Sequence, residues 1–140
     1  MIINESKVRV RYGETDKMGY CYYGVYAQYF EIGRTELMRN YGLTYKKIED
    51  AGIMLPVLSL NVKFIKPAFY DDELTIKTYL TKLPLVRIEF LYEIYNQHNE
   101  LLNNGETTLV FIDSSTRKPM KAPQEFIDIL TPFFNRAIMV

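Results

Sequence analysis

The sequence has one cysteine and one histidine among 140 residues, and these two scarcities exclude several kinds of chemistry. Cys21 has no second cysteine with which to form a disulfide inside the chain, so we expect a small core side chain. His98 cannot anchor a metal site that needs several ligands, and it lies in NQHNELLNNG, which reads as a polar hairpin turn. That position disfavours both a Cys–His pair and a Ser-His-Asp triad. We therefore expect no metal and no cofactor, and any catalysis must use carboxylates, hydroxyls, tyrosines or backbone dipoles.

The chain also lacks a surplus of either charge and any long apolar run. Its 17 basic and 17 acidic residues give a net charge of zero, whereas a nucleic-acid binder usually carries a basic surplus. No stretch approaches the roughly 18–20 apolar residues that a membrane helix requires. The first residues, MIINESKVRV, lack the apolar core of a signal peptide. We expect a cytoplasmic protein with no nucleic-acid partner and no integral membrane segment.

What is present is the composition of one globular domain, which we assign to residues 1–140. Apolar residues make up 48% and charged residues 24% of the chain. Alternating or β-branched and aromatic patterns predict five strands, at residues 6–12, 57–66, 73–80, 85–96 and 106–113. The polar stretch 96–105, with its Asn-Asn-Gly, predicts a hairpin, and residues 67–72 predict a turn. Short links between these strands indicate an antiparallel sheet and the α+β class.

One long helical pattern covers residues 24–40. Its apolar side chains fill an arc of roughly 160°, which predicts a helix that is largely buried. Asn40 and Gly42 supply a stop, and Thr44 is a suitable N-cap for a short helix over residues 45–52. A third helix is expected to begin at Pro123, in the first turn. These pieces favour a curved antiparallel sheet wrapped around one central helix.

The segment VRVRYGETDKMGYCYYGVYAQYFEIGRTELMR resembles the N-terminal signature of hot-dog-fold acyl-CoA thioesterases of the 4-hydroxybenzoyl-CoA thioesterase type. The matching positions are Tyr12, Thr15, Asp16, Gly19, Tyr29, Phe30, Glu31, Arg34 and Glu36. The likeness continues to RKPMKAP at 117–123, so it covers nearly the whole chain. It implies a hot-dog fold and hydrolysis of an acyl-CoA thioester to free acid and coenzyme A, in the manner of the bacterial cytoplasmic branch.

The resemblance also assigns catalytic roles. Asp16 is the expected general base or nucleophile, and the backbone amides of Tyr23 and Gly24 are expected to polarise the thioester carbonyl. Taken alone, Thr-Asp-x-x-Gly is more often a loop than an active site. Some relatives use a carboxylate on the central helix, so Glu31 is the reserve candidate, although it points to the polar arc. Many relatives have Val-Val-Tyr-His where this chain has CYYG, which puts Tyr23 at the histidine position.

Substrate contacts are expected from residues close to this motif. A reversal between strand and helix needs the conformational freedom of Gly19. Tyrosines could line an acyl pocket or belong to the core; our candidates for substrate binding are Gly19, Tyr22, Tyr26, Tyr29 and Lys63. Lys63 is one of several cations that could meet the phosphates of coenzyme A or simply face solvent. Glu36 falls inside the apolar arc, so it must pair with Arg34, with Arg39 or with a second subunit, or emerge into solvent.

The resemblance further implies a homodimer or homotetramer. An open sheet edge invites pairing, and hot-dog proteins pair into a continuous sheet with the active site between subunits. Two other functions stay open at this point: hydrolysis of acyl groups on acyl carrier protein, and acyl-thioester binding without turnover. The length of the acyl group and its aromatic or aliphatic nature are also open.

Overall fold

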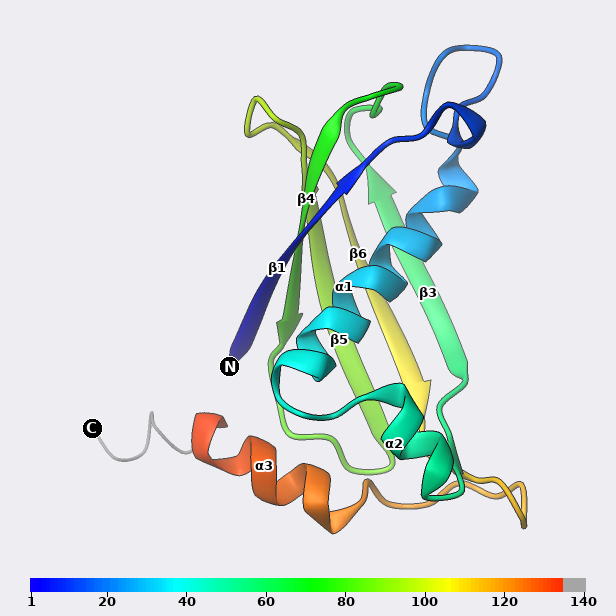
Figure 1. Cartoon of the computed structure of the whole chain (residues 1–140), viewed down its shortest axis with the longest axis vertical. Coiled ribbons are helices and arrows are strands. Elements are labelled where there is room, and N and C mark those ends of the chain that lie inside the picture. The colour runs from blue at the N-terminus through cyan, green and yellow to red at the C-terminus, as the bar shows by residue number, and fades with distance from the viewer. Residues whose placement is uncertain (135–140) are drawn as a thin grey trace.

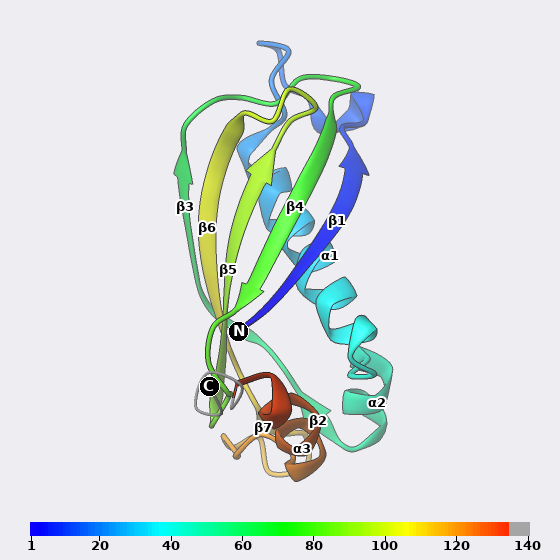
Figure 2. The ribbon, with the colours of Figure 1, turned by 90° about the vertical axis from the view of Figure 1, so that its left-hand side faces the viewer.

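The computed structural model describes residues 1–134, in which five antiparallel strands curve around one long helix (Figures 1 and 2). The sheet has the order β1-β4-β5-β6-β3. Its strands are β1 (Ile2–Arg9), β3 (Val57–Phe64), β4 (Glu73–Leu80), β5 (Arg87–Tyr95) and β6 (Leu101–Val110). Helix α1 (Tyr26–Asn40) lies along one face of this sheet. The α+β class and the sheet-around-helix architecture predicted from the sequence are confirmed.

Smaller elements complete the chain. Helices α2 (Tyr45–Asp50) and α3 (Gln124–Phe134) lie near the C-terminal end of α1 (Figure 2). Strands β2 (Ile53–Met54) and β7 (Ile112–Asp113) form a two-stranded sheet in the same region. Two 3-10 turns, Tyr12–Glu14 and Tyr23–Val25, flank the loop that precedes α1. Within residues 1–134, no helix is long and apolar enough to cross a membrane.

Helix α1 sits very close to the sheet because two glycines leave room for it. A Cβ atom on Gly33 would lie 2.3 Å from Oγ1 of Thr78 in β4. A Cβ atom on Gly105 in β6 would lie 2.6 Å from the ring of Phe30. The Phe30 ring stacks on Tyr92 of β5 at 4.3 Å between centroids. The core is therefore a thin, aromatic-rich layer between α1 and the sheet.

The helices follow the predicted signals. Helix α1 ends at Asn40, and Gly42 has the positive φ of 75° expected just beyond a helix. The Thr44 hydroxyl accepts a hydrogen bond from the Lys47 amide at 3.3 Å, so the N-cap is confirmed. Glu36 pairs with Arg39 and its side chain is 40% exposed, which selects one of the alternatives left open by the sequence.

Two strands, β1 and β6, are displaced from their predicted positions, whereas β3 and β5 differ only by one or two residues at their ends. The first strand is Ile2–Arg9 rather than 6–12, because the chain leaves the sheet at Val10 and enters a 3-10 turn at Tyr12. The hairpin predicted for the stretch 96–105 is confirmed, since β5 pairs with β6, but Asn-Asn-Gly is not its turn because residues 103–105 lie inside β6. The turn closes earlier, where the Asn96 carboxamide oxygen accepts from the amides of His98 and Glu100.

Strand β3 is one of the two edges of the sheet, and most of its apolar side chains are exposed, Val62 being partly buried against the core. Leu58, Leu60 and Phe64 share the helix-facing side of the strand, as the alternation predicts, yet each is 46–53% exposed. Burial fails because α1 packs mainly over β1, β4 and β5 and leaves this side of β3 largely uncovered. Because β3 has a neighbour, β6, on one side only, its other edge presents unpaired backbone groups beside a row of apolar side chains.

Candidate active site

The loop that carries Asp16 is a miniature hairpin. The Tyr22 amide donates to the Glu14 carbonyl at 2.7 Å, and the Asp16 amide donates to the Tyr20 carbonyl at 2.8 Å. Gly19, with φ at 80°, closes the turn by donating to the Asp16 carbonyl at 3.0 Å. The positive φ explains the glycine at this position. The hairpin presents residue 16 on a short and fully hydrogen-bonded support.

One oxygen of Asp16 is engaged and the other is not. Oδ1 accepts from the amides of Met18 at 2.9 Å and Tyr20 at 3.2 Å, which fixes the orientation of the carboxylate. Oδ2 accepts no hydrogen bond from any residue between 1 and 134. A carboxylate with one anchored and one unengaged oxygen is suited to take a proton or to attack an electrophile.

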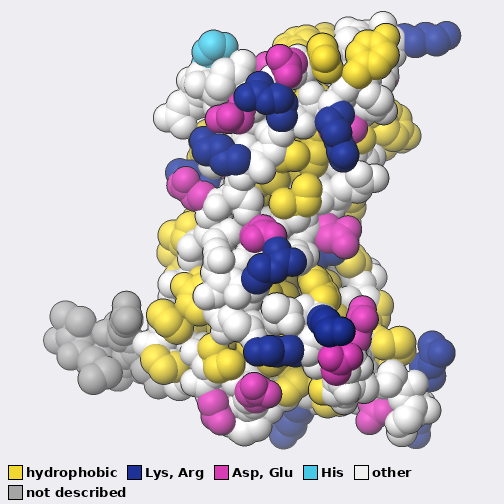
Figure 3. Space-filling view, viewed as in Figure 1, with side chains coloured by type: hydrophobic (Ala, Val, Ile, Leu, Met, Phe, Trp, Pro, Cys, Tyr) yellow, Lys and Arg dark blue, Asp and Glu magenta, His cyan; other side chains and the backbone are white. Residues whose placement is uncertain are grey.

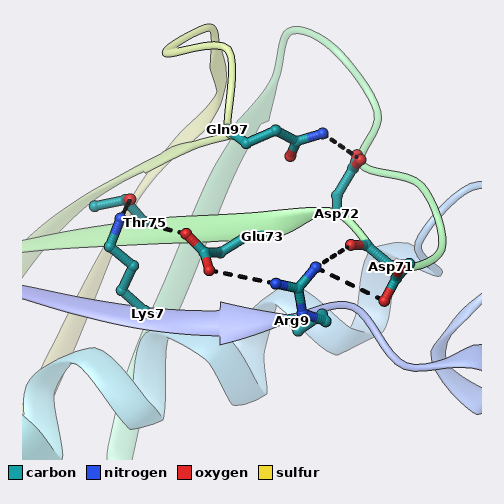
Figure 4. Close-up of polar contacts among 7 residues, drawn as sticks. All are labelled: Lys7, Arg9, Asp71, Asp72, Glu73, Thr75 and Gln97. Carbon is teal, nitrogen blue, oxygen red and sulfur yellow. Dashed lines mark hydrogen bonds and ion pairs between the residues drawn. The ribbon is translucent and has the colours of Figure 1, made fainter.

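A second turn braces the hairpin from the side. The Cys21 amide donates to the Ala68 carbonyl at 2.8 Å, and the rings of Tyr20 and Phe69 meet edge to face. Residues 67–72 are held in turn by an ionic network around Arg9 (Figure 4). The Arg9 guanidinium donates to the Asp71 carbonyl at 2.8 Å and pairs with the Glu73 carboxylate at 3.4 Å.

Glu14, which sequence reasoning did not single out, ties this hairpin to α1. The residue is only 9% exposed, and its Oε1 accepts from the hydroxyl of Tyr29 at 2.8 Å. Its carboxylate also accepts from the Arg11 amide at 2.9 Å and the Arg11 guanidinium at 2.8 Å. Burial raises the pKa of Glu14, but the bonds from Arg11 and Tyr29 outweigh it, so the pKa is lowered overall. The carboxylate is ionised at neutral pH. Glu14 lies two residues before Asp16, at a position that the motif leaves unspecified.

Cys21 is buried, as predicted, and it belongs to the same network. Its Sγ lies 3.8 Å from the Tyr29 hydroxyl and the side chain is 5% exposed. Burial raises the pKa of the thiol, so the thiol stays protonated at neutral pH. Tyr29 is itself a core residue, since it is 1% exposed, and burial together with its bond to Glu14 raises the pKa of its hydroxyl.

A cavity of about 280 Å³ opens between the hairpin, the start of α1 and the end of β3. Its walls are mainly aromatic and apolar, and the lining residues are Asp16, Met18, Tyr20, Cys21, Tyr23, Tyr26, Phe64, Ile65, Lys66 and Pro67. The Tyr26 hydroxyl accepts from the Ala68 amide at 3.3 Å, and burial raises the pKa of Tyr26 to about 12. Figure 3 shows hydrophobic side chains gathered at this end of the molecule.

Two backbone amides at the start of α1 are unengaged. Tyr23 and Gly24 begin the 3-10 turn that leads into α1, where the first amides have no partner within the helix. Neither amide donates a hydrogen bond to another part of the described chain. The ring of Tyr22 covers Gly24, since a Cβ atom there would lie 2.7 Å from its Cε2.

The structure brings only some of the predicted site residues together. Asp16, Tyr23 and Tyr26 line the cavity, and Gly19 shapes the loop beside it. Tyr22 lies over Gly24 and outside the lining. Tyr29 and Lys63 do not reach this cavity: Tyr29 turns inward to Glu14, and Lys63 points to the opposite face of the sheet. Glu31 is exposed on α1 and is likewise absent from the lining.

Strand alternation keeps the Lys63 side chain out of the Asp16 cavity. Phe64 faces the helix, so its neighbour in the strand must face the other side of the sheet. Lys63 lines a larger hollow of about 710 Å³ on that outer face. Within residues 1–134, no group of three or more His, Cys, Asp or Glu residues could hold a metal ion. The arrangement around Asp16 offers one carboxylate oxygen, free amides and an aromatic cavity.

Comparison with known proteins identifies the family of this chain. The family model of the thioesterase-like superfamily matches residues 10–130. Among curated relatives, the chain is 29% identical over 133 residues to a putative acyl-CoA thioesterase, YneP, of Bacillus subtilis, covering 95% of this chain and 96% of that one. It is 31% identical over 120 residues to the acyl-CoA thioester hydrolase YbgC of Escherichia coli O157:H7, covering 86% and 90%.

Solved structures give the same result. A DHNA-CoA thioesterase from Staphylococcus aureus superposes with a TM-score of 0.83 at 36% identity, covering 99% of this chain and 90% of that one. A hypothetical protein from Thermus thermophilus superposes with a TM-score of 0.85 at 27% identity, covering 94% and 97%. This chain therefore belongs to the thioesterase-like superfamily and has the hot-dog fold.

Proposed function

We propose that this protein is an acyl-CoA thioesterase that hydrolyses an acyl-CoA thioester to the free acid and coenzyme A. The observation that carries the proposal is the unengaged carboxylate oxygen of Asp16 at a small aromatic cavity that Tyr23 also lines. The names of its relatives support the same activity. We also propose that the protein acts in the cytoplasm.

In the proposed reaction, Asp16 removes a proton from a water molecule as that water attacks the thioester carbonyl carbon. Negative charge then develops on the carbonyl oxygen, and the amides of Tyr23 and Gly24 stabilise it together with the positive end of α1. Collapse of the intermediate breaks the carbon–sulfur bond, and the proton on Asp16 passes to the departing thiolate. If Asp16 attacks directly, the carbon–sulfur bond breaks as a mixed anhydride forms, and coenzyme A leaves as the thiolate. Water then hydrolyses the anhydride to the free acid and the Asp16 carboxylate, and the proton released from that water passes to the thiolate.

We further propose that β3 pairs with β3 of a second copy in a homodimer, which a second pairing could double to a homotetramer. The exposed apolar side of β3 and its unpaired edge support this assembly. Phe64 and Ile65 reach the wall of the Asp16 cavity from the end of that strand. A partner along this edge would therefore cover the open side of the cavity.

The test is release of free thiol from a panel of short, long and aromatic acyl-CoAs. Asp16→Asn should reduce kcat by about 10²–10⁴-fold without unfolding the chain. Glu31→Gln is the matched control, because Glu31 is exposed and absent from the lining, and it should keep wild-type rates.

Equal turnover in Asp16→Asn and wild type would remove Asp16 from the mechanism, and loss in Glu31→Gln alone would move catalysis to that residue. The wild type could instead cleave no CoA ester and yet release acyl groups from acyl carrier protein. In that case the substrate would be an acyl-carrier-protein thioester rather than an acyl-CoA. Binding of acyl-CoA without cleavage would refute the enzyme and leave a binding protein.

A further inference from the structure

The open edge of β3 carries a defined set of backbone groups. The Ile65 amide donates to the Leu102 carbonyl of β6 at 2.8 Å, and the register between the two strands is regular from Ser59 onward. In an antiparallel pair, only every second residue bonds to a given neighbour. The odd-numbered residues from Ser59 to Ile65 therefore bond to β6. The amides and carbonyls that point to the open edge belong to the residues between them, which are Leu60, Val62 and Phe64.

These groups limit how a second copy can pair with the edge. Two copies of β3 related by a two-fold axis run antiparallel to each other. Each hydrogen-bonded pair must join an edge-pointing residue of one copy to an edge-pointing residue of the other. Because edge-pointing residues have even numbers, the axis lies level with a single residue rather than between two. The central choices are Leu60, Asn61 and Val62, each of which would face its own copy.

An axis level with Asn61 gives the best match of side chains. On the helix-facing side it sets Leu60 against Val62 of the second copy, and Phe64 against Leu58 of the second copy, so every contact is apolar. On the outer side the two Asn61 carboxamides face each other, and each can donate to the other.

The neighbouring registers each have a defect. An axis one residue nearer the end of β3 sets Leu58 against the charged side chain of Lys66. An axis one residue nearer its start sets Phe64 against Pro56, which has no amide to donate and precedes the strand. The register centred on Asn61 is therefore the one that the edge fits.

In this register, Leu58 of the second copy reaches the Asp16 cavity. Phe64 lines that cavity, and Leu58 of the second copy lies directly opposite it on the same side of the sheet. Directly paired residues have Cβ atoms about 4.5–5.5 Å apart, which is side-chain contact. Leu58 is 52% exposed and Phe64 is 53% exposed in the single chain, so both side chains are available for this contact.

We infer that Leu58 of the second copy forms the outer wall of the acyl cavity and limits the size of the acyl group. This inference rests on the proposed function and identifies the partner residue of that same site. Within one chain, Leu58 is absent from the lining of the cavity. Its own Asp16 lies near the other end of β3, so it can act only on the site of the other copy.

Engineered cysteines test the register without any substrate. Asn61→Cys should form a disulfide-linked dimer on oxidation with copper phenanthroline, because only the residue on the axis faces its own copy at bonding distance. Leu60→Cys and Val62→Cys should form much less. The wild type is the control, because its one cysteine, Cys21, is 5% exposed and should give no linked dimer on a non-reducing gel.

A bulkier side chain at residue 58 tests the wall. One methylene in an apolar pocket is worth about 10–200-fold in kcat/KM. Leu58→Trp should therefore lower kcat/KM for aromatic and long acyl-CoAs by about tenfold or more, relative to the shortest acyl-CoA that the wild type hydrolyses. Leu60→Trp is the matched control, since Leu60 is 46% exposed on the same side of β3 and is absent from the lining. It should keep the wild-type ratio, with sedimentation confirming that both variants assemble alike.

Mixed dimers decide between the two copies. A dimer of one Asp16→Asn chain and one Leu58→Trp chain keeps an intact site only if Leu58 acts across the interface. Random assembly of the two co-expressed variants makes about half of the dimers mixed, so about a quarter of the wild-type rate should return with the larger esters. If Leu58 acts within its own chain, no site is intact and the rate stays at the level of the two parents.

The strongest link at Leu60→Cys or Val62→Cys would overturn the register, and no link at any of the three positions would overturn pairing through β3. Mixed dimers no more active than their parents would overturn the role of Leu58 while the thioesterase function stands. If the wild type hydrolyses no ester, the proposed function fails and the limit on acyl size fails with it. The link at Asn61→Cys would then still support the register, and its absence would refute it.

Discussion

Replacing Tyr29 with phenylalanine tests whether Glu14 joins the Asp16 hairpin to α1. The change removes one hydroxyl, which donates to Glu14 at 2.8 Å, and keeps the ring. Tyr29 is 1% exposed, so water cannot take the place of the hydroxyl. A hydrogen bond to a charged group contributes about 1.5–3 kcal/mol. We expect the free energy of unfolding to fall by about that amount at pH 7, with a midpoint lower by roughly 5–12 °C.

The loss should depend on pH, with a sign set by the lowered pKa of Glu14. A carboxylate with a lowered pKa in the folded state stabilises the protein above its ordinary pKa, which is 4.5. That stabilisation disappears as the pH falls through the folded-state pKa. Because Tyr29→Phe raises the pKa of Glu14 toward 4.5, the difference between wild type and variant should be full at pH 7 and should shrink below about pH 4.

The assay is urea unfolding followed by circular dichroism at pH 7 and pH 3.5, at one fixed protein concentration. Tyr79→Phe is the control, because the Tyr79 hydroxyl also bonds to a carboxylate, that of Glu93, on the outer face of the sheet. Its side chain is partly exposed, and water can replace the lost bond. Equal losses in the two variants, or a Tyr29→Phe loss that is the same at both pH values, would refute the role assigned to Glu14.

Three further changes test the packing, the edge and the cap. Gly33→Ala places a methyl group 2.3 Å from Oγ1 of Thr78 and 2.9 Å from Cγ2 of Ile76, so urea unfolding should show a loss of about 1–3 kcal/mol. Leu60→Lys puts a charge on the exposed side of β3; if β3 pairs with a second copy as proposed, sedimentation should show dimers for the wild type and monomers for the variant. Thr44→Ala removes the cap of α2 and should cost about 1 kcal/mol, again by urea unfolding, whereas Thr44→Ser should restore wild-type stability.

Local sequence patterns predicted most of the fold because they reflect local causes. Strand β4 was predicted at its observed bounds, since alternation along Glu73–Leu80 matches a sheet with one buried face. The cap at Thr44 and the stop at Gly42 are likewise properties of a few neighbouring residues. The turn at residues 96–100 was misplaced because Asn-Asn-Gly later in the same stretch carries the stronger turn signal, yet Asn96 closes the chain first.

The site was predictable only in part, because burial depends on distant residues. Asp16 was identified by resemblance, and the structure adds the unengaged oxygen. Glu14 was missed because its burial comes from packing against Tyr29, which is 15 residues away. The burial of Asn103 in β6, whose side-chain amide has no hydrogen-bond partner among the described residues, could not be predicted either, because the sequence of β6 has no clear alternation to show which side faces α1.

The ionic network around Arg9 makes the turn that supports the Asp16 hairpin sensitive to dissolved ions (Figure 4). Arg9, Asp71 and Glu73 have side chains that are 45–66% exposed, so dissolved ions screen their attraction. The turn that this network holds supplies Ala68 and Phe69, which brace the Asp16 hairpin, whereas the helix beneath is held by buried aromatic rings that salt does not weaken. We therefore expect a rise in ionic strength to weaken the support of Asp16 more than the packing of the core, and a salt-tolerant variant would be obtained by rebuilding that turn rather than the core.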